Sequence, residues 1–305
     1  MSNLRELSRR IDSITSTKQI TRTMEMVSTA RVGEALQRAS DAAPYKDAIR
    51  RILSAVANSD PRAADQPLLH KHETDNGTLF ILIASDRGLA GGFNLVLQRK
   101  VDQRVRELRA QGKTAEVITC GTKPTDYLRY RGIKPVLSFT GMSADPTHDE
   151  AVQIASYVID GYTAGTFDRV VICYNHARNR VQQDVVDEQL LPVSADEFKM
   201  PGFPRTKPPV EQVEPKEYTE FLFDPSPAKV LGYLMPAYIQ TVIYHALLDS
   251  AAAEHAARRR AMQAATDNAN EAITTLNRMY NRIRQGSITT ELNEIIGGAS
   301  ALEDN

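Results

Sequence analysis

Helix-breaking residues are nearly absent from the two ends of this 305-residue sequence, and tryptophan is absent throughout. All 15 prolines lie between Pro44 and Pro236, and no glycine occurs before Gly33. Aromatic residues are missing from the ends as well, since none precedes Tyr45 and Tyr280 is the single one after residue 244. The ends are rich in Ala, Leu, Met, Arg and Glu instead, which favours a long helix at each end and a different structure between them.

Long apolar runs and an excess of one charge are also missing. The longest strongly apolar run covers residues 79–84, whereas a membrane-spanning helix needs roughly 20 residues. Lys and Arg number 37 against 38 Asp and Glu, and this balance argues against a protein that binds nucleic acid through bulk charge. The first seven residues lack the apolar core of a secretory signal and the acid-poor composition of a transit peptide, so we expect a cytoplasmic product.

Cysteine is scarce, which limits both disulfide and metal chemistry. Cys120 and Cys173 lie in apolar, strand-like surroundings without Cys-x-x-Cys spacing, so we expect buried, reduced thiols and no disulfide framework. The composition, with 42% hydrophobic and 25% charged residues, excludes a disordered or collagen-like chain. At about twice the usual domain length, the chain forms either two structural units or one unit with a large extension.

Apolar residues at the N-terminal end repeat with the spacing of a coiled coil. They follow a 3-4-3 rhythm and then resume out of phase, which predicts a heptad seam with a stutter. The first set is Leu4, Leu7, Ile11 and Ile14, and the second set is Ile20, Met24 and Val27. Asn3 followed by Glu6 resembles a capping box, so we expect the helix to begin near residue 3.

The C-terminal end carries a similar pattern over a longer stretch. Ser226 followed by Pro227 provides a good N-cap before a proline in the first helical position, which predicts the start of the last long helix. From residue 265 an apolar seam continues toward the end of the chain, with one change of phase. Its members are Ala265, Ala269, Ala272, Leu276, Met279, Ile283, Ile288, Leu292, Ile295, Ala299 and Leu302.

The two helices differ in length. At about 1.5 Å per residue, residues 3–57 span roughly 80 Å and residues 226–303 roughly 110 Å. Because each has one narrow apolar seam, we expect them to pair as an antiparallel coiled coil whose C-terminal tip protrudes. An apolar tip exposed to water predicts that another protein surrounds it. The alternative is that residues 286–305, which contain three glycines, fold back or fray.

Between residues 77 and 223 strand-like and helix-like segments alternate. This order predicts a parallel sheet flanked by helices, closed by a hairpin and a loop rich in proline. The expected strands are 78–84, 116–120, 135–139, 169–174 and 180–192, and we expect residues 218–223 to add an edge strand. The expected helices are 93–110, 125–131 and 147–164. A hairpin turn is expected at 175–179 and a loop at 200–216.

The most enzyme-like segment is the turn at residues 85–92, because open α/β sheets often bind ligands where a strand leads into a helix. It matches neither Gly-x-Gly-x-x-Gly nor Gly-x-x-x-x-Gly-Lys-Ser/Thr, so it supplies no lysine for a phosphate and no hydroxyl for magnesium. We therefore favour a tight structural turn over a nucleotide site.

Other polar residues give no catalytic pattern. His70 and His72 have no third metal ligand nearby, which favours a solvated loop. His176 falls in the expected hairpin turn, and His245 and His255 fall on the last helix without a defensible triad. Arginines along both terminal helices, among them residues 258–260, are either a solvated coiled-coil face or contacts to acidic loops of a partner.

Many segments match one protein family in sequence and in order. They are residues 10–14, 20–27, 85–89, 91–94, 189–192, 246–248, 254–258, 265–269, 280–282, 284–285, 288–289 and 291–292. With these segments the chain resembles the gamma subunits of F-type ATP synthases. The resemblance implies an α/β fold plus a long antiparallel coiled coil, in which helices at 1–58 and 226–305 flank a Rossmann-like central domain at 77–223.

The resemblance also implies a function. The chain would be a rotary shaft, catalysing nothing and needing no cofactor or metal, whose coiled coil turns inside a ring of alpha and beta subunits. The central domain would contact the epsilon subunit and the membrane rotor ring. Rotation would couple ion flow to ATP synthesis or hydrolysis by favouring a different conformation in each beta subunit. The expected place is the cytoplasmic face of a bacterial inner membrane, as a peripheral subunit.

Family residues that contact the beta subunits carry over to both terminal helices. They are Met24, Glu25, Met26, Arg258, Arg284, Gln285, Thr289 and Glu291. The sequence departs from the family at Lys18 and Gln19, which stand in reverse order, and at Ala90, where a cysteine is frequent. Arg259 and Arg260 replace a usual methionine, and the plastid insertion with its regulatory cysteine pair is missing, so no thiol control is expected.

Two other classes of function compete with the shaft. A small-molecule enzyme would bind a ligand at residues 85–92. A passive coiled-coil scaffold would leave the ATPase activity of its partner unchanged when Arg284 and Gln285 are replaced by alanine, whereas a shaft would lose coupling or hydrolysis.

Overall fold

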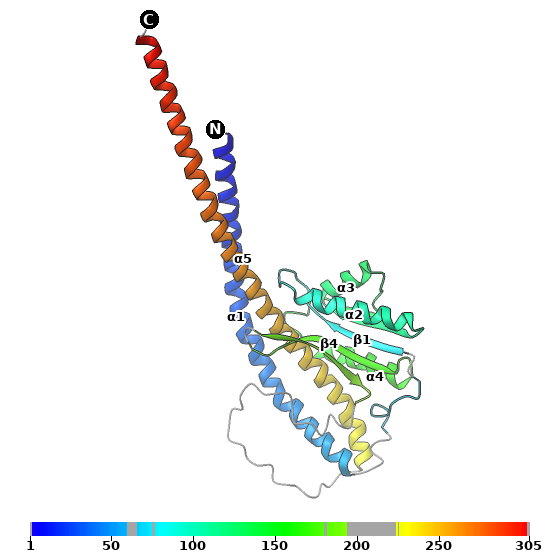
Figure 1. Cartoon of the computed structure of the whole chain (residues 1–305). Coiled ribbons are helices and arrows are strands. Elements are labelled where there is room, and N and C mark those ends of the chain that lie inside the picture. Colours follow the sequence, from blue (N-terminus) through cyan, green and yellow to red (C-terminus); the bar gives the residue numbers. More distant parts are fainter. Residues whose placement is uncertain are drawn as a thin grey trace. The chain divides into compact units, whose positions relative to one another are not determined.

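The computed structural model describes residues 2–59, 66–74, 77–179, 182–193, 224 and 226–303. It divides into two compact units. Unit 1 combines Met1–Val27 with Arg259–Asn305, and unit 2 consists of Ser28–Arg258. The expected edge strand at 218–223 and the loop at 200–216 lie outside the described residues. Figure 1 shows the elements with the labels used below.

Both terminal helices form as the sequence predicts. Helix α1 covers Ser2–Ser59 and helix α5 covers Pro227–Glu303. At the start of α5 the backbone N–H of Lys229 donates to Ser226 Oγ at 3.5 Å, and that of Val230 donates to the Ser226 carbonyl oxygen at 3.0 Å. The helix runs without a break past Gly286, which contradicts the alternative in which residues 286–305 fold back.

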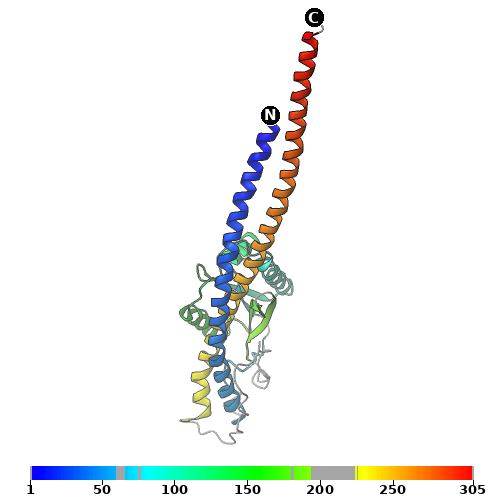
Figure 2. The same cartoon turned by 90° about the vertical axis from the view of Figure 1, so that its left-hand side faces the viewer.

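In unit 1 the two helices lie side by side, and α5 continues past the N-terminal end of α1 (Figure 2). The predicted stutter in the seam of α1 is wrong, because Ile20 and Val27 are exposed. The heptad instead continues in phase through Thr21, which is buried. Burial of this polar side chain costs little because its hydroxyl lies 2.9 Å from the hydroxyl of Thr266 on α5.

The seam of α5 also differs in part from the sequence pattern. Ala269 is buried and Leu276 is half-buried, as expected, but the phase then places Tyr280 toward the seam and leaves Met279 exposed. The seam of the helix therefore continues without a change of phase. The sequence pattern placed Met279 in the seam because Met279 is more apolar than its neighbour Tyr280.

Unit 2 contains a five-stranded sheet with the order β3-β2-β1-β4-β5. Strands β1 to β4 are parallel where they pair, and β5 is antiparallel to β4. The strands are β1 Gly77–Ile83, β2 Thr114–Cys120, β3 Leu137–Phe139, β4 Arg169–Ala177 and β5 Gln183–Leu191. Strand β4 extends further than predicted, so His176 is a strand residue paired with Asp184 and not a turn residue.

Three helices connect the parallel strands. They are α2 Phe93–Ala110, α3 Thr122–Tyr130 and α4 His148–Thr163. Alternate residues of β1 point to opposite faces, so Phe80 packs in a core with α2 and α3, while Ile81 packs in a core with α4, α1 and α5. Cys120 and Cys173 are free and buried, as expected, and burial raises the pKa of both thiols.

Candidate functional site

The turn after β1 is built around the carboxylate of Asp86. Its Oδ1 accepts the backbone N–H and the hydroxyl of Thr122, both at 2.9 Å, and the N–H of Gly141 at 2.8 Å. Its Oδ2 accepts the N–H of Ser143 at 2.9 Å, and the Asp86 N–H donates to Ser143 Oγ at 2.9 Å. Burial alone would raise the pKa of this carboxyl, but these hydrogen bonds outweigh it and hold the pKa below its ordinary value.

The rest of the turn is closed by short-range contacts. Asn94, in the first turn of α2, accepts the backbone N–H of Ser85 at 2.9 Å through Oδ1. Leu89 adopts a φ of 64°, which is uncommon for a branched side chain, and it is exposed to solvent. Nearby, a Cβ on Gly121 would lie 2.6 Å from the carbonyl oxygen of Ala84, so that position tolerates only glycine.

Helix α5 covers this turn. Ala84, Ala90 and Phe93 form one buried cluster with small α5 residues, among them Ala252 and Ala253. The small side chains allow the backbone of α5 to approach the turn closely. The crevice at the carboxyl ends of β1 and β4, where the strand order reverses and doubly wound sheets bind ligands, is therefore filled by the chain's own helix.

A buried ion pair fastens the same part of α5. Arg258 Nη2 lies 2.7 Å from Glu254 Oε1, and both side chains are almost fully buried. The same nitrogen lies 3.4 Å from the carbonyl oxygens of Arg87 and Gly88 in the turn. Arg258, which was expected to contact a beta subunit, is thus bonded within its own chain.

A second acidic residue of α5 binds the end of β4. Asp249 accepts the backbone N–H of Ala177 at 3.1 Å and also pairs with Nδ1 of His176. The hydrogen bond to Asp249 outweighs burial and raises the pKa of His176. Burial lowers the pKa of the neighbouring His245 to about 4, so that imidazole is neutral at physiological pH.

The loop between β3 and α4 makes a third attachment. Arg38 on α1 pairs with Asp145 and donates to the carbonyl oxygen of Pro146 at 3.3 Å. At the start of α4, the ring of His148 meets that of Tyr244 on α5 edge to face, with centroids 5.5 Å apart. Two loops and the end of β4, all at the carboxyl edge of the sheet, are therefore in contact with the two helices, and this arrangement fits a mechanical junction better than a substrate cleft.

One histidine of the loop before β1, His72, also has structural contacts. His72 Nδ1 lies 3.1 Å from Asp168, and its ring stacks on Tyr162 with centroids 4.4 Å apart. Thr74 and the N–H of Gly77 donate to the same Asp168 carboxylate at 2.6 and 3.0 Å. Within the described ranges, His, Cys, Asp and Glu side chains form no group of three or more suited to a metal ion.

The sequence-predicted contact residues on α1 lie together at the surface of unit 1. Met26 is exposed, while Met24 and Glu25 are half-buried. Glu25 lies 3.1 Å from Arg22, one turn away on the same helix. Met26 is thus exposed to solvent, whereas Met24 lies closer to the seam.

The predicted contact residues near the end of α5 are all exposed. Thr289 donates to the carbonyl oxygen of Gln285 at 3.0 Å, and Ser287 lies 3.5 Å from the carboxylate of Glu291. Arg284 lies on the same solvent-facing stretch. Every residue from 288 to 296 is exposed, including four large aliphatic side chains. They are Ile288, Leu292, Ile295 and Ile296.

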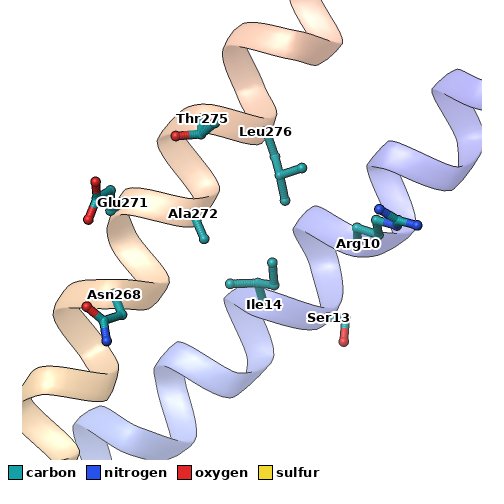
Figure 3. A pocket seen from close by; sticks show the side chains of 8 residues that line it. All are labelled: Arg10, Ser13, Ile14, Asn268, Glu271, Ala272, Thr275 and Leu276. Atoms are coloured by element: carbon teal, nitrogen blue, oxygen red, sulfur yellow. The ribbon is translucent and has the colours of Figure 1, made fainter.

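Unit 1 also has an open groove of about 670 Å³ between its two helices (Figure 3). Ile14 and Leu276 point toward each other across it, with Ala272 beside them, while Arg10 points away. Arg10 is paired with Glu6 at 2.7 Å. The groove is part of the coiled-coil seam, because the side chains that face each other across it are apolar.

Sequence reasoning missed the three carboxylates that make the junction, of which Asp86 is half-buried and the other two are buried. Asp86 and Glu254 belong to segments that match the family but have no role assigned from the sequence, and Asp249 was not singled out. A signal was available, since residues 246–257 are otherwise nearly all small or apolar, and an acidic residue in such a helix needs a buried partner.

Comparison with known proteins gives a consistent result. A family model described as ATP synthase matches residues 3–302. The ATP synthase gamma chain of Pelotomaculum thermopropionicum is 39% identical over 303 residues, covering 99% of this chain and 100% of that protein. The ATP synthase gamma chain of a Nocardioides species is 37% identical over 306 residues, covering 99% of this chain and 97% of that protein.

Solved structures share the fold. A chain in the OSCP, F1 and c-ring structure of the Euglena gracilis mitochondrial ATP synthase has a TM-score of 0.65 at 18% identity, over 99% of this chain and 95% of that chain. A chain in the central stalk and c-ring of the Tetrahymena thermophila enzyme has a TM-score of 0.59 at 22% identity, over 81% of this chain and 99% of that chain.

None of the helices has the length and the apolar composition that crossing a membrane requires, over the residues that the structure describes. The carboxyl edge of the sheet holds helices where an enzyme of this architecture would hold a substrate. On the family match over almost its full length and on its identity to two curated relatives, the chain belongs to the family of ATP synthase gamma chains.

Proposed function

We propose that this chain is the central rotor shaft of a bacterial F-type ATP synthase and performs no bond chemistry itself. The observation that carries the proposal is the exposed apolar stretch of α5 beyond the end of α1, at residues 288–296. Ile295 is 72% exposed and Leu292 is 53% exposed. Such a surface is unfavourable in water and fits inside an apolar sleeve formed by partner subunits.

The partners follow from the family. Alternating alpha and beta subunits would surround unit 1, and the domain at 77–223 would contact the epsilon subunit and the membrane rotor ring. Each orientation of the shaft would offer a different set of contacts to each beta subunit and so stabilise a different conformation of its catalytic site. Because this coupling is reciprocal, ion flow can drive synthesis and hydrolysis can drive pumping.

We propose that the exposed polar residues of α5 and α1 make the contacts to the beta subunits. Arg284, Gln285, Thr289 and Glu291 are exposed and lie within two turns of one another, which suits hydrogen bonding to polar loops. Met26 offers an exposed apolar contact, with Met24 and Glu25 beside it. Arg258 would contribute while it also holds the turn at residues 85–92.

The proposed place is the cytoplasmic face of the inner membrane, where the chain would be held as a peripheral subunit by its partners. The curated relatives named above are bacterial.

The test is to isolate the tagged chain from gently solubilised membranes and to assay the complex for ATP hydrolysis. A shaft is recovered in a large ATPase in which two nucleotide-binding subunits greatly outnumber it. Recovery of the chain alone, or binding of a nucleotide to the isolated chain, would contradict the proposal and favour an enzyme.

A second test separates a shaft from a passive scaffold. Replacing Arg284 and Gln285 together by alanine removes two exposed polar side chains and leaves the described core intact. A shaft loses coupling or hydrolysis in this variant. Replacing Asn277 by alanine serves as the matched control, because Asn277 is an exposed polar residue about two turns nearer the middle of α5. Normal ATPase activity and normal pumping in the double variant would favour the scaffold.

A further inference from the structure

The loops at the carboxyl edge of the sheet come from three different strands, and Asp86 is bonded to all of them. Its own turn follows β1, Thr122 begins α3 directly after β2, and Gly141 and Ser143 follow β3. Thr122, Gly141 and Ser143 each donate a backbone N–H, and Thr122 adds its hydroxyl, so a carboxylate here takes the position that an anionic ligand takes in other doubly wound sheets. One side chain joins loops that have no covalent connection to one another at this edge.

The bonds continue from Asp86 to α5 within a few residues. Arg87 and Gly88 follow Asp86 directly, and their carbonyl oxygens face the guanidinium of Arg258 at 3.4 Å. Arg258 is in turn paired with Glu254 on the preceding turn of α5. Any motion of the turn relative to the sheet therefore changes the hydrogen bonds between the turn and Arg258 of α5.

We propose that Asp86 is a positioning residue for torque transmission, whose carboxylate makes three loops into one rigid seat for α5. The inference rests on the proposed shaft function. Force applied to the α/β domain reaches α5 through this seat, and force on α5 returns the same way. Without the carboxylate, the N–H groups of Thr122, Gly141 and Ser143 lose their acceptor, and the turn can move relative to the sheet.

The experiment uses the assembled complex with the Asp86→Ala variant of this chain. A probe attached at Tyr130, an exposed residue at the end of α3, reports the angular fluctuations of the domain while the shaft is held in its ring. We expect the mean-square angular fluctuation to rise roughly twofold, because four charge-assisted hydrogen bonds that restrain the turn are lost. We also expect fewer ions pumped for each ATP hydrolysed.

Chemical rescue distinguishes positioning from a general loss of stability. Formate is a free carboxylate small enough for the space left by the Asp86 side chain, and it can accept the same backbone N–H groups. Added formate should bring the fluctuations of Asp86→Ala back toward the wild-type value and should leave the wild type unchanged. Asp126→Asn, which alters an exposed carboxylate of α3, is the matched control and should behave as wild type in both conditions.

Two milder variants keep the test decisive if Asp86→Ala does not assemble. Thr122→Val removes the hydroxyl that donates to Asp86 and keeps the backbone N–H, and Ser143→Ala removes the acceptor of the Asp86 N–H. Each should raise the fluctuations by a smaller factor than Asp86→Ala. Wild-type stiffness and coupling in every variant that assembles would overturn the inference. Failure of the shaft function itself would be seen separately, as an absence of coupled rotation with the wild-type chain.

Discussion

Two stretches of the same helix meet opposite environments. Residues 246–258 of α5 are all buried within unit 2, whereas residues 288–296 are all exposed in unit 1. The buried stretch is rich in alanine and includes Asp249 and Glu254 as paired acids, while the exposed stretch contains four isoleucine and leucine side chains. Hydrophobicity alone would predict that residues 288–296 are buried and residues 246–258 are exposed. Side-chain size decides here, because small residues let a helix enter a domain, and large apolar residues left outside require a partner.

The largest expected effect comes from breaking the ion pair in the buried stretch. Glu254→Ala leaves Arg258 buried without its carboxylate, so we expect unit 2 to lose about 3–5 kcal/mol of unfolding free energy. Chemical denaturation of the isolated chain measures the loss. Replacing Glu254 and Arg258 together by methionine should cost much less, because no unpaired charge remains. An equal loss in the single and double variants would show that packing, and not charge, dominates.

A smaller loss is expected from adding volume in the same stretch. Ala253→Leu inserts three heavy atoms where α5 packs against Ala84 and Phe93, and overpacking of this kind costs about 1–3 kcal/mol. Ala264→Leu, at an exposed position of α5, is the matched control and should change the unfolding free energy little. A tolerated leucine at position 253 would mean that the helix is held less closely than the burial indicates.

The pairing of His176 with Asp249 predicts a pH effect with a defined sign. Because Asp249 raises the pKa of His176 in the folded chain, the pairing stabilises the fold fully below the unfolded pKa of about 6.5. This contribution is lost as the pH rises through the folded pKa. His176→Gln should therefore lower the melting temperature more at mildly acidic than at alkaline pH, where the variant and wild type converge. The charges of Lys46, Glu188 and Asp184 act on the same pair, so the difference between variant and wild type is the quantity to measure.

The smallest effect on stability is expected in the exposed stretch. Leu292→Ser should change the unfolding free energy of the isolated chain by less than about 0.5 kcal/mol, because this side chain already faces solvent. The same change should weaken assembly with the alpha and beta subunits, which co-purification at increasing salt and detergent measures. A clear loss of stability with normal assembly would mean that the tip packs on its own chain.

The sequence predicted most of the secondary structure because the signals were local. Helix α2 begins and ends where its pattern places it, and Ser226 with Pro227 marks the start of α5. The prediction of burial and strand length failed where a residue distant in the sequence determines the structure. Thr21 is buried only because Thr266 supplies a hydrogen bond, and β4 continues through His176 because β5 pairs with it. The candidate site shows the same difference. Its exposed residues were predicted from the family resemblance, whereas the junction was missed because it depends on contacts between distant segments.

The hydroxyl pair between Thr21 and Thr266 also has a consequence for how the chain is made. The two residues are separated by 245 positions, so the partner of the first helix leaves the ribosome almost at the end of synthesis. During that interval the seam of α1 has no helix to pair with, whereas the parallel strands of unit 2 can already assemble. Unit 1 therefore closes last, and until then the apolar seam of the newly made N-terminal helix stays exposed.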